Sequence, residues 1–225
     1  MITSKDNDKL KLIRKLHERK HREREGLFIA EGEDLVAAAD AAGWEPAFVL
    51  RAGRDVEPAL LDSVSTLGSG TRAIGVYPRI AGEGAGGFGV YLDGVGDPGN
   101  VGTIIRTADA LLGAPVSCGP GTADPFSPKA VRASMGSIFT RPPIGGGLSE
   151  LADPVVGLAA HGGKAPDDAS VGALVVGAER QGLSDEAAAR CERLWTIPLR
   201  PEAESLNVAA AAAIAIGRIS SAADD

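Results

Sequence analysis

The stretch 172–184, GALVVGAERQGLS, decides the fold class. Its run Leu174-Val175-Val176 is apolar without alternation, as in a strand that is covered on both faces of a parallel sheet. A glycine-rich turn ends this strand, and Ser184 is suited to begin a short helix. The same order of strand, turn and helix recurs along residues 89–220, which is typical of an α/β protein.

Working outward from this stretch, we expect the neighbouring segments to continue the sheet. The predicted strands are 89–92, 115–118, a segment near 139–144, 154–159, 172–177 and 194–199. The predicted helices are 100–112, a segment around 128–136, a short helix from 184, and 205–220.

The first part of the chain has a different pattern. Leu10, Ile13 and Leu16 fall at helical spacing among charges, so residues 6–24 predict one amphipathic helix. A helix at 31–42 and strands at 46–51 and 73–77 follow. Residues 80–89, IAGEGAGGFG, contain five glycines and predict a linker. We therefore expect a domain at 1–79, a linker at 80–89 and a second domain at 90–225.

Composition excludes several protein classes. Of 225 residues, 44% are hydrophobic and 24% charged, which excludes disorder as the main state. The uncharged stretch from Ser205 to Gly217 is shorter than the roughly 18 residues of a membrane span, and the charged N-terminus is no secretory signal. Cys118 and Cys191 are too few for a disulfide framework or a zinc site, so we expect two buried, reduced thiols in a cytoplasmic protein. His17, His21 and His161 lack metal-like spacing, and no metal is implied.

Charge is unevenly distributed along the chain. The net charge is −7, but residues 1–24 hold nine Lys and Arg against four Asp and Glu. This asymmetry indicates an acidic body with a basic contact arm. A solvated amphipathic helix explains the same charges and stays open as an alternative.

Residues 94–99, GVGDPG, match the dinucleotide pattern G-x-G-x-x-G after a strand and before a helix. Pro98 lacks an N–H, and Asp97 places negative charge where a pyrophosphate would bind. The following strand ends in Cys118-Gly119-Pro120, without an acidic residue for a ribose hydroxyl. An NAD-dependent oxidoreductase is therefore a weak alternative.

Three distant segments each follow a predicted strand, where open α/β sheets build their sites. They are 97–108, DPGNVGTIIRTA; 176–184, VGAERQGLS; and 197–208, IPLRPEAESLNV.

This sequence resembles the SpoU/TrmH branch of the SPOUT RNA methyltransferases. The resemblance rests on three ordered motifs over about residues 85–220. The matching residues are Asn100, Gly102 and Arg106; Gly177, Glu179, Gly182 and Leu183; and Ile197, Pro198, Ser205, Leu206, Asn207 and Val208. Residues 123–136 also resemble the middle segment of the family. Arg22, Phe28, Glu31 and Gly32 give a looser match to its N-terminal RNA-recruiting domain.

The resemblance implies methyl transfer from S-adenosylmethionine to a ribose 2′-hydroxyl of RNA, with 23S ribosomal RNA as the expected substrate. A tRNA substrate, or a non-catalytic RNA-binding factor with the same fold, are the alternatives. The implied fold is a parallel α/β sheet with a trefoil knot, preceded by a small α/β RNA-binding domain. The family works as a homodimer with the cofactor pocket beside the interface.

The resemblance and the chemistry together suggest residue roles. An adenine needs apolar walls, which Ile197, Leu199 and Leu206 can supply. Gly177 and Gly182 let the loop close over the rest of the cofactor without a Cβ clash.

The expected catalytic residues are Arg106, Asn100, Glu179, Ser205 and Asn207. A guanidinium stays protonated, so we expect Arg106 to orient the ribose and a phosphate by a forked contact rather than to act as a base. Glu179 is expected to hold Arg106 or its dimer mate. Asn100, Ser205 and Asn207 are expected to position the hydroxyl or to satisfy the loop backbone.

Simpler explanations for these residues stay open. Asn100 and Ser205 suit helix N-caps, and Glu179 can pair with Arg180 or Arg200.

Cations of the first domain can contact RNA phosphates, which fixes position without selecting sequence. The expected contacts are Lys11, Arg14, Lys15, Arg19, Lys20 and Arg22. We expect Trp44 and Trp195 in the core.

Overall fold

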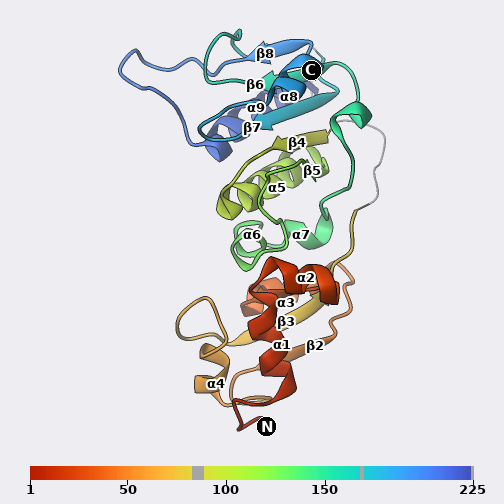
Figure 1. The fold of residues 1–225 in the computed structure, drawn as a ribbon, viewed down its shortest axis with the longest axis vertical. Helices are drawn as coiled ribbons and strands as arrows, with labels where there is room; N and C mark the ends of the chain where they lie inside the picture. Colours follow the sequence, from red (N-terminus) through yellow and green to blue (C-terminus); the bar gives the residue numbers. More distant parts are fainter. Residues whose placement is uncertain (83–88, 168–169, 224–225) are drawn as a thin grey trace.

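The computed structural model describes residues 1–82, 89–167 and 170–223. Two sheets are stacked along the longest axis of the molecule, each with its own helices (Figure 1). Residues 83–88 of the predicted linker lie outside the described residues. Next to them, Gly82 forms an isolated bridge with Ile144, and Gly89 begins a strand.

The N-terminal sheet is antiparallel with the order β1-β3-β2. Its strands are β1 (Leu27–Glu31), β2 (Phe48–Arg51) and β3 (Ala73–Pro78). The helices around it are α1 (Asp8–Leu16), α2 (Arg19–Glu25), α3 (Glu33–Ala41) and α4 (Pro58–Asp62). Leu10, Ile13 and Leu16 are fully buried, so the apolar stripe of α1 packs into this domain as its spacing indicated.

The C-terminal sheet is parallel with the order β5-β4-β7-β6-β8. Its strands are β4 (Gly89–Asp93), β5 (Val116–Cys118), β6 (Val155–Leu158), β7 (Ala173–Gly177) and β8 (Arg193–Trp195). The helices are α5 (Pro98–Leu112), α6 (Pro128–Ala133), α7 (Ser137–Thr140), the short 3-10 helix η1 (Leu148–Glu150), α8 (Asp185–Arg190) and α9 (Val208–Ala223). The deciding strand, β7, is the central one and every residue of it is buried, which confirms the α/β class.

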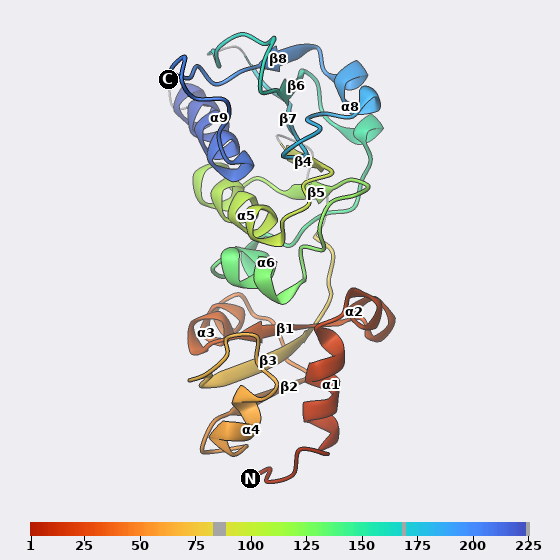
Figure 2. The ribbon, with the colours of Figure 1, turned by 60° about the vertical axis from the view of Figure 1, so that its left-hand side comes forward.

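Helices cover both faces of this sheet. Figure 2 shows α5 and α9 side by side on one face and α8 on the other. Parallel strands all end at the same edge, so the segments that follow β4, β7 and β8 are brought together there.

Aromatic side chains join the two domains into one core. The Phe28 ring lies 5.0 Å from the Phe126 ring and 5.8 Å from the Phe139 ring, measured between centroids. Trp44 packs edge-on against Phe139, and its Nε1 donates to the Phe139 carbonyl over 2.9 Å. Trp195 is 1% exposed and lies in the core as expected, while Trp44 is partly buried and packs against the same core.

The single helix predicted for residues 6–24 is wrong. The chain leaves the helix at His17 and Glu18 and starts a second one at Arg19, because Glu18 has an extended backbone with ψ of 134°. The Arg22 guanidinium donates 2.8 Å hydrogen bonds to the Leu16 and His17 carbonyls and so stabilises this bend. The apolar spacing alone gave no sign of the break.

The strand predicted near 139–144 is also wrong. Residues through Thr140 form α7, and Pro142 and Pro143 have no N–H to donate to a strand neighbour. Ile144 forms only isolated bridges. Two other boundaries shift: β8 stops at Trp195 rather than 199, and α9 starts at Val208 rather than 205.

Both cysteines are free, as expected, but each is partly rather than fully buried. Burial raises the pKa of the Cys118 thiol to about 12 and that of the Cys191 thiol to about 11. Thiols that stay protonated are poor nucleophiles, so neither is suited to covalent chemistry.

Candidate active site

The turn after β7 is closed by its own backbone. The Ala178 N–H donates to the Gly182 carbonyl over 2.9 Å, and the Gly182 N–H donates back over 3.0 Å. A Cβ on Gly177 would lie 2.4 Å from the Gly182 carbonyl carbon, and Gly182 has φ of +74°. Glycine is therefore required at 177 for space and is favoured at 182 for its conformation.

One side of this turn faces a cavity of about 440 Å³. The cavity lies between the turn, the end of β6 and the segment that leads into α9. All five residues expected to bind the cofactor line it: Gly177, Gly182, Ile197, Leu199 and Leu206. Ser205 lines it too, while Leu158 and Val176 add to its apolar wall.

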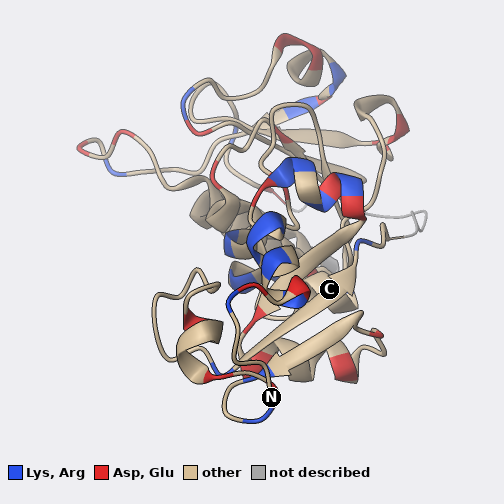
Figure 3. Cartoon of the chain, turned by 60° about the horizontal axis from the view of Figure 1, so that its bottom comes forward, with Lys and Arg blue, Asp and Glu red and all other residues tan. Residues whose placement is uncertain are grey.

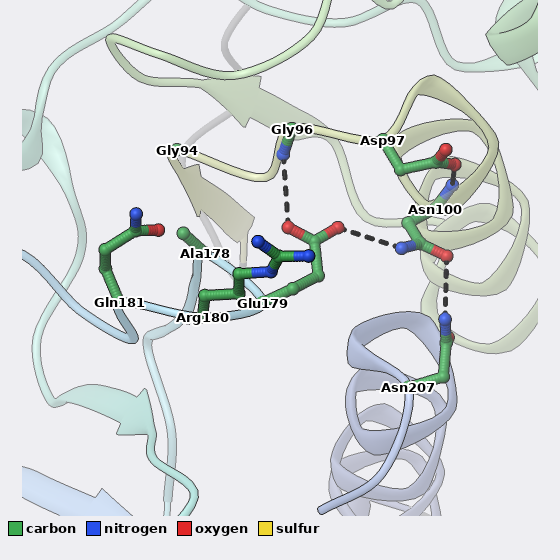
Figure 4. Close-up of a pocket in the computed structure, with 9 residues that line it drawn as sticks. All are labelled: Gly94, Gly96, Asp97, Asn100, Ala178, Glu179, Arg180, Gln181 and Asn207. Carbon is green, nitrogen blue, oxygen red and sulfur yellow. Dashed lines mark hydrogen bonds between the residues drawn. The ribbon is translucent and has the colours of Figure 1, made fainter.

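The other side of the turn faces a second cavity, of about 650 Å³, between the ends of β4 and β7 and the start of α9. Its lining, drawn in Figure 4, is Gly94, Gly96, Asp97, Asn100, Ala178, Glu179, Arg180, Gln181 and Asn207. This cavity is polar where the first is apolar. Residues 178–181 line both cavities and form the wall between them.

A chain of hydrogen bonds crosses the polar cavity and joins all three motifs. Glu179 accepts from the Gly96 N–H over 3.3 Å and from Asn100 Nδ2 over 2.9 Å. Asn100 Oδ1 accepts from Asn207 Nδ2 over 3.1 Å. Figure 4 shows these bonds running from the β4 loop to the first turn of α9.

The pKa of Glu179 is lowered. Burial opposes ionisation of this carboxyl group, but the hydrogen bonds from Asn100 and from the backbone N–H groups of Gly96 and Asp97 together outweigh it. Glu179 is therefore a carboxylate at neutral pH and accepts hydrogen bonds only.

Asp97, and not Asn100, caps α5. Its Oδ1 accepts from the Gly99 and Asn100 N–H groups over 2.7 and 3.1 Å, and its Oδ2 pairs with Lys129 Nζ at 2.6 Å. The hydrogen bond from Lys129 lowers the pKa of Asp97, helped by the two backbone N–H groups. The N-terminus of α5 is thus already occupied by a carboxylate, which contradicts a pyrophosphate site there.

Asn207 caps α9, so the N-cap role considered for Ser205 is wrong. Asn207 Oδ1 accepts from the Ala209 and Ala210 N–H groups over 2.9 and 3.2 Å. Ser205 is exposed and lines the apolar cavity instead.

Arg106 lies on the exposed face of α5 and lines neither cavity. In the described part of the chain it makes no ion pair, and both Glu179 oxygens are bonded elsewhere. Within one chain, therefore, Glu179 does not hold Arg106. Nor does Glu179 form an ion pair with Arg180 or Arg200 among the described residues.

The expected RNA contacts divide into two groups. Lys11, Arg14, Lys15, Arg19 and Lys20 are exposed, and Figure 3 shows Lys and Arg along α1 and α2 with Asp and Glu among them. Three of these cations, Lys11, Arg19 and Lys20, form ion pairs at the surface.

Arg22 is different, and its expected contact with phosphate is contradicted. It is 3% exposed, and its Nε lies 2.8 Å from Asp124 Oδ2 of the second domain. The Arg22 guanidinium therefore forms a buried ion pair between the domains and cannot reach a phosphate at the surface.

Among the described residues, no helix is both long and apolar enough to cross a bilayer. Nor does that part of the chain place three or more His, Cys, Asp and Glu side chains where they could hold a metal ion.

Comparison with known proteins decides the family. The profile of the SpoU rRNA Methylase family matches residues 87–217. The chain belongs to this family. The profile of the MRM3-like substrate binding domain matches residues 7–80 of this SpoU protein.

Full-length relatives agree with this assignment. The chain is 33% identical to the 23S rRNA (guanosine(2553)-2'-O)-methyltransferase RlmP of Bacillus subtilis, over 96% of this chain and 97% of the relative. An AdoMet-bound rRNA methyltransferase from Sinorhizobium meliloti superposes with a TM-score of 0.85 at 30% identity, covering 97% of this chain and 96% of that one. The SpoU methyltransferase AviRb from Streptomyces viridochromogenes, also with AdoMet, gives 0.85 at 25% identity, with coverage of 97% and 99%.

Part of the polar cavity was not predicted from the sequence. Gly94 and Gly96 were interpreted only as parts of a dinucleotide motif, although Gly96 donates to Glu179. Arg180 and Gln181 were not proposed as site residues. Their position inside a short turn flanked by Gly177 and Gly182 was the available signal.

Proposed function

We propose that this protein is an S-adenosylmethionine-dependent methyltransferase acting on a ribose 2′-hydroxyl of 23S ribosomal RNA. The observation that carries this proposal is the meeting of three distant motifs at one turn, with an apolar cavity on one side and a polar one on the other. Membership of the SpoU family supports the reaction class. The activity of the full-length Bacillus subtilis relative RlmP on 23S rRNA supports the substrate.

The residues present fit the cofactor. Ile197, Leu199 and Leu206 give the 440 Å³ cavity the apolar walls that an adenine ring requires, while Gly177 and Gly182 keep its floor free of side chains. When bound, S-adenosylmethionine supplies an electrophilic methyl group on a sulfonium centre.

The polar cavity then receives the acceptor nucleotide. Asn100, Glu179 and Asn207 hold one another in fixed orientations there, so that the ribose hydroxyl is aligned without reorganisation of the site. Ser205 faces the cofactor side and is proposed to help position the hydroxyl. We propose that Arg106 of one subunit orients the ribose and a phosphate at the site of the other subunit. Within its own chain Arg106 is exposed and lines neither cavity.

Further parts of the proposal concern assembly. We place an RNA-binding domain at 1–79, the linker at 80–89 and a knotted catalytic domain at 90–225. A homodimer in the cytoplasm is proposed, and exposed apolar side chains on α5 and α9, Leu111 and Ile214, are compatible with a covering subunit.

The test is methylation of RNA from a strain that lacks the gene. Purified protein with labelled cofactor should place label on a ribose of 23S rRNA, and Arg106→Ala should abolish it. Lys164→Ala, which removes an exposed cation of the second domain that lines neither cavity, should keep activity.

Two results would change the proposal. Label on tRNA alone would change the substrate. Cofactor binding without turnover on any RNA would instead favour the non-catalytic RNA-binding factor.

A further inference from the structure

Arg180 occupies an unusual position in the site. It lies in the turn that separates the two cavities and lines both of them. It is the only Lys or Arg among the described residues that line the polar cavity. Figure 4 shows its guanidinium beside the Glu179 carboxylate.

Neither carboxylate of the polar cavity forms an ion pair with this cation among the described residues. Asp97 is paired with Lys129 and accepts two backbone N–H groups. Both oxygens of Glu179 are taken by Gly96 and Asn100. Arg180 is exposed and makes no ion pair within the part of the chain that the structure describes.

The acceptor carries an anion at a fixed place. In RNA the 2′-hydroxyl and the 3′-phosphate are attached to adjacent carbons of the ribose. A group that binds this phosphate therefore also fixes the hydroxyl. A guanidinium suits the task, because its planar donors form paired hydrogen bonds to phosphate oxygens.

We propose that Arg180 is a positioning residue that binds the 3′-phosphate of the acceptor nucleotide in the polar cavity. It acts from the same subunit as the turn that contacts the cofactor, so one short segment positions both reactants. This inference rests on the proposed function and deepens it. The role of Arg180 is distinct from that of Arg106, whose side chain lines neither cavity of its own chain.

The first experiment measures RNA binding as a function of salt. With cofactor present, the Arg180→Gln variant should bind 23S rRNA from the deletion strain with a salt slope reduced by about one, since one phosphate contact is lost. Its KM for RNA should rise about tenfold, as for loss of a charged hydrogen bond, with cofactor affinity unchanged. Arg180→Lys should restore most of the salt slope. Lys164→Gln removes the same charge at an exposed site of the second domain that lines neither cavity, and it should change neither the slope nor KM.

The second experiment removes the phosphate charge instead of the cation. Once the methylated nucleotide is mapped, a synthetic RNA with a methylphosphonate at its 3′ side should react equally with wild type and Arg180→Gln. A persistent difference between the two proteins would overturn the proposal.

Other outcomes are distinguishable. Weaker cofactor binding with an unchanged KM for RNA would assign Arg180 to the cofactor carboxylate and overturn the inference. If the wild type methylates no RNA, the proposed function fails, whereas the salt slopes still test the phosphate contact.

Discussion

The side chains of Asn100 and Asn207 meet although 107 residues separate them in the chain. Asn207 Oδ1 accepts hydrogen bonds from two N–H groups of α9, so only its Nδ2 can face Asn100. Asn100 must then present Oδ1 to Asn207, which turns its Nδ2 toward Glu179. The α9 terminus therefore fixes the direction of every hydrogen bond as far as Glu179.

Asn100→Ala breaks this chain of bonds at its middle. We expect kcat to fall about ten- to hundredfold, the order of a lost hydrogen bond to a charged group. Cofactor affinity and Tm should stay near wild type, because Asn100 is not part of the apolar cavity. Single-turnover methylation and calorimetry provide the measurements.

Thr103→Ala is the matched control for this change. Thr103 is exposed one turn further along α5, and its hydroxyl bonds only to the Gly99 carbonyl. The Thr103→Ala variant should have wild-type activity. Full activity of Asn100→Ala would show that the chain of hydrogen bonds does not contribute to catalysis.

Much of this site was predictable from sequence because each motif follows a strand of a parallel sheet. Strand ends converge at one edge whatever the loop lengths, so the three motifs could be expected to meet there. The choice of Gly177, Ile197 and Leu206 as cofactor contacts followed from the family resemblance, and all three line one cavity. The sequence did not indicate which polar residue would cap which helix. Asp97 and Asn100 are both good N-caps, and only the partners Lys129 and Glu179 decide between them.

The error in the first helix has its cause in a long-range contact. The break in the first helix at His17 is stabilised by Arg22, and Arg22 in turn is held by Asp124, which is 102 residues away. Local periodicity carries no information about such a pair. The same pair explains why Arg22 was wrongly grouped with the surface cations: its neighbours in sequence are exposed, whereas its neighbour in space is in another domain.

Arg22 and Arg19 should therefore behave oppositely. Arg22→Ala removes the nearer cation from the buried Asp124 carboxylate and leaves it with Arg79, at 3.6 Å, and the Phe126 N–H, so we expect a loss of about 3 kcal/mol in the free energy of unfolding. Arg19→Ala should leave stability nearly unchanged but weaken RNA binding and lower its salt slope. Denaturant unfolding and salt-dependent binding distinguish the two variants. An Arg22→Ala protein of wild-type stability would contradict the buried contact.

Asp97 should contribute stability that depends on pH. Its pKa in the folded protein is below its ordinary value of 3.8, chiefly because of Lys129, so folding favours its ionised form. The stabilisation is complete above pH 3.8 and is lost as the pH falls through the folded pKa.

Asp97→Asn isolates this charge, because Asn is also a good N-cap. The Tm of the wild type should exceed that of the variant at neutral pH, and the gap should close on acidification. Asp6→Asn, at an exposed N-terminal position, serves as the control. A gap that is constant down to the lowest pH would show that the pairing with Lys129 contributes nothing.

Three glycines near the site should respond to alanine in a defined order. At Gly96 a Cβ meets nothing within 4 Å, so Gly96→Ala should bind the cofactor like the wild type. At Gly182 there is space but φ is +74°, and Gly182→Ala should cost about 1–2 kcal/mol in strain. At Gly177 the new Cβ would lie 2.4 Å from backbone of the same turn, which must move and deform the cavity.

We therefore expect Gly177→Ala to lose at least about tenfold in cofactor affinity, equivalent to about 1.4 kcal/mol. Calorimetric titration with S-adenosylmethionine measures this directly, and Tm without cofactor separates a deformed turn from an unfolded domain. Equal cofactor affinity in the Gly177 and Gly96 variants would contradict the placement of the cofactor against this turn. A loss of affinity in the Gly177 variant alone would support this placement, because Gly177 lines the apolar cavity whereas Gly96 lines only the polar one.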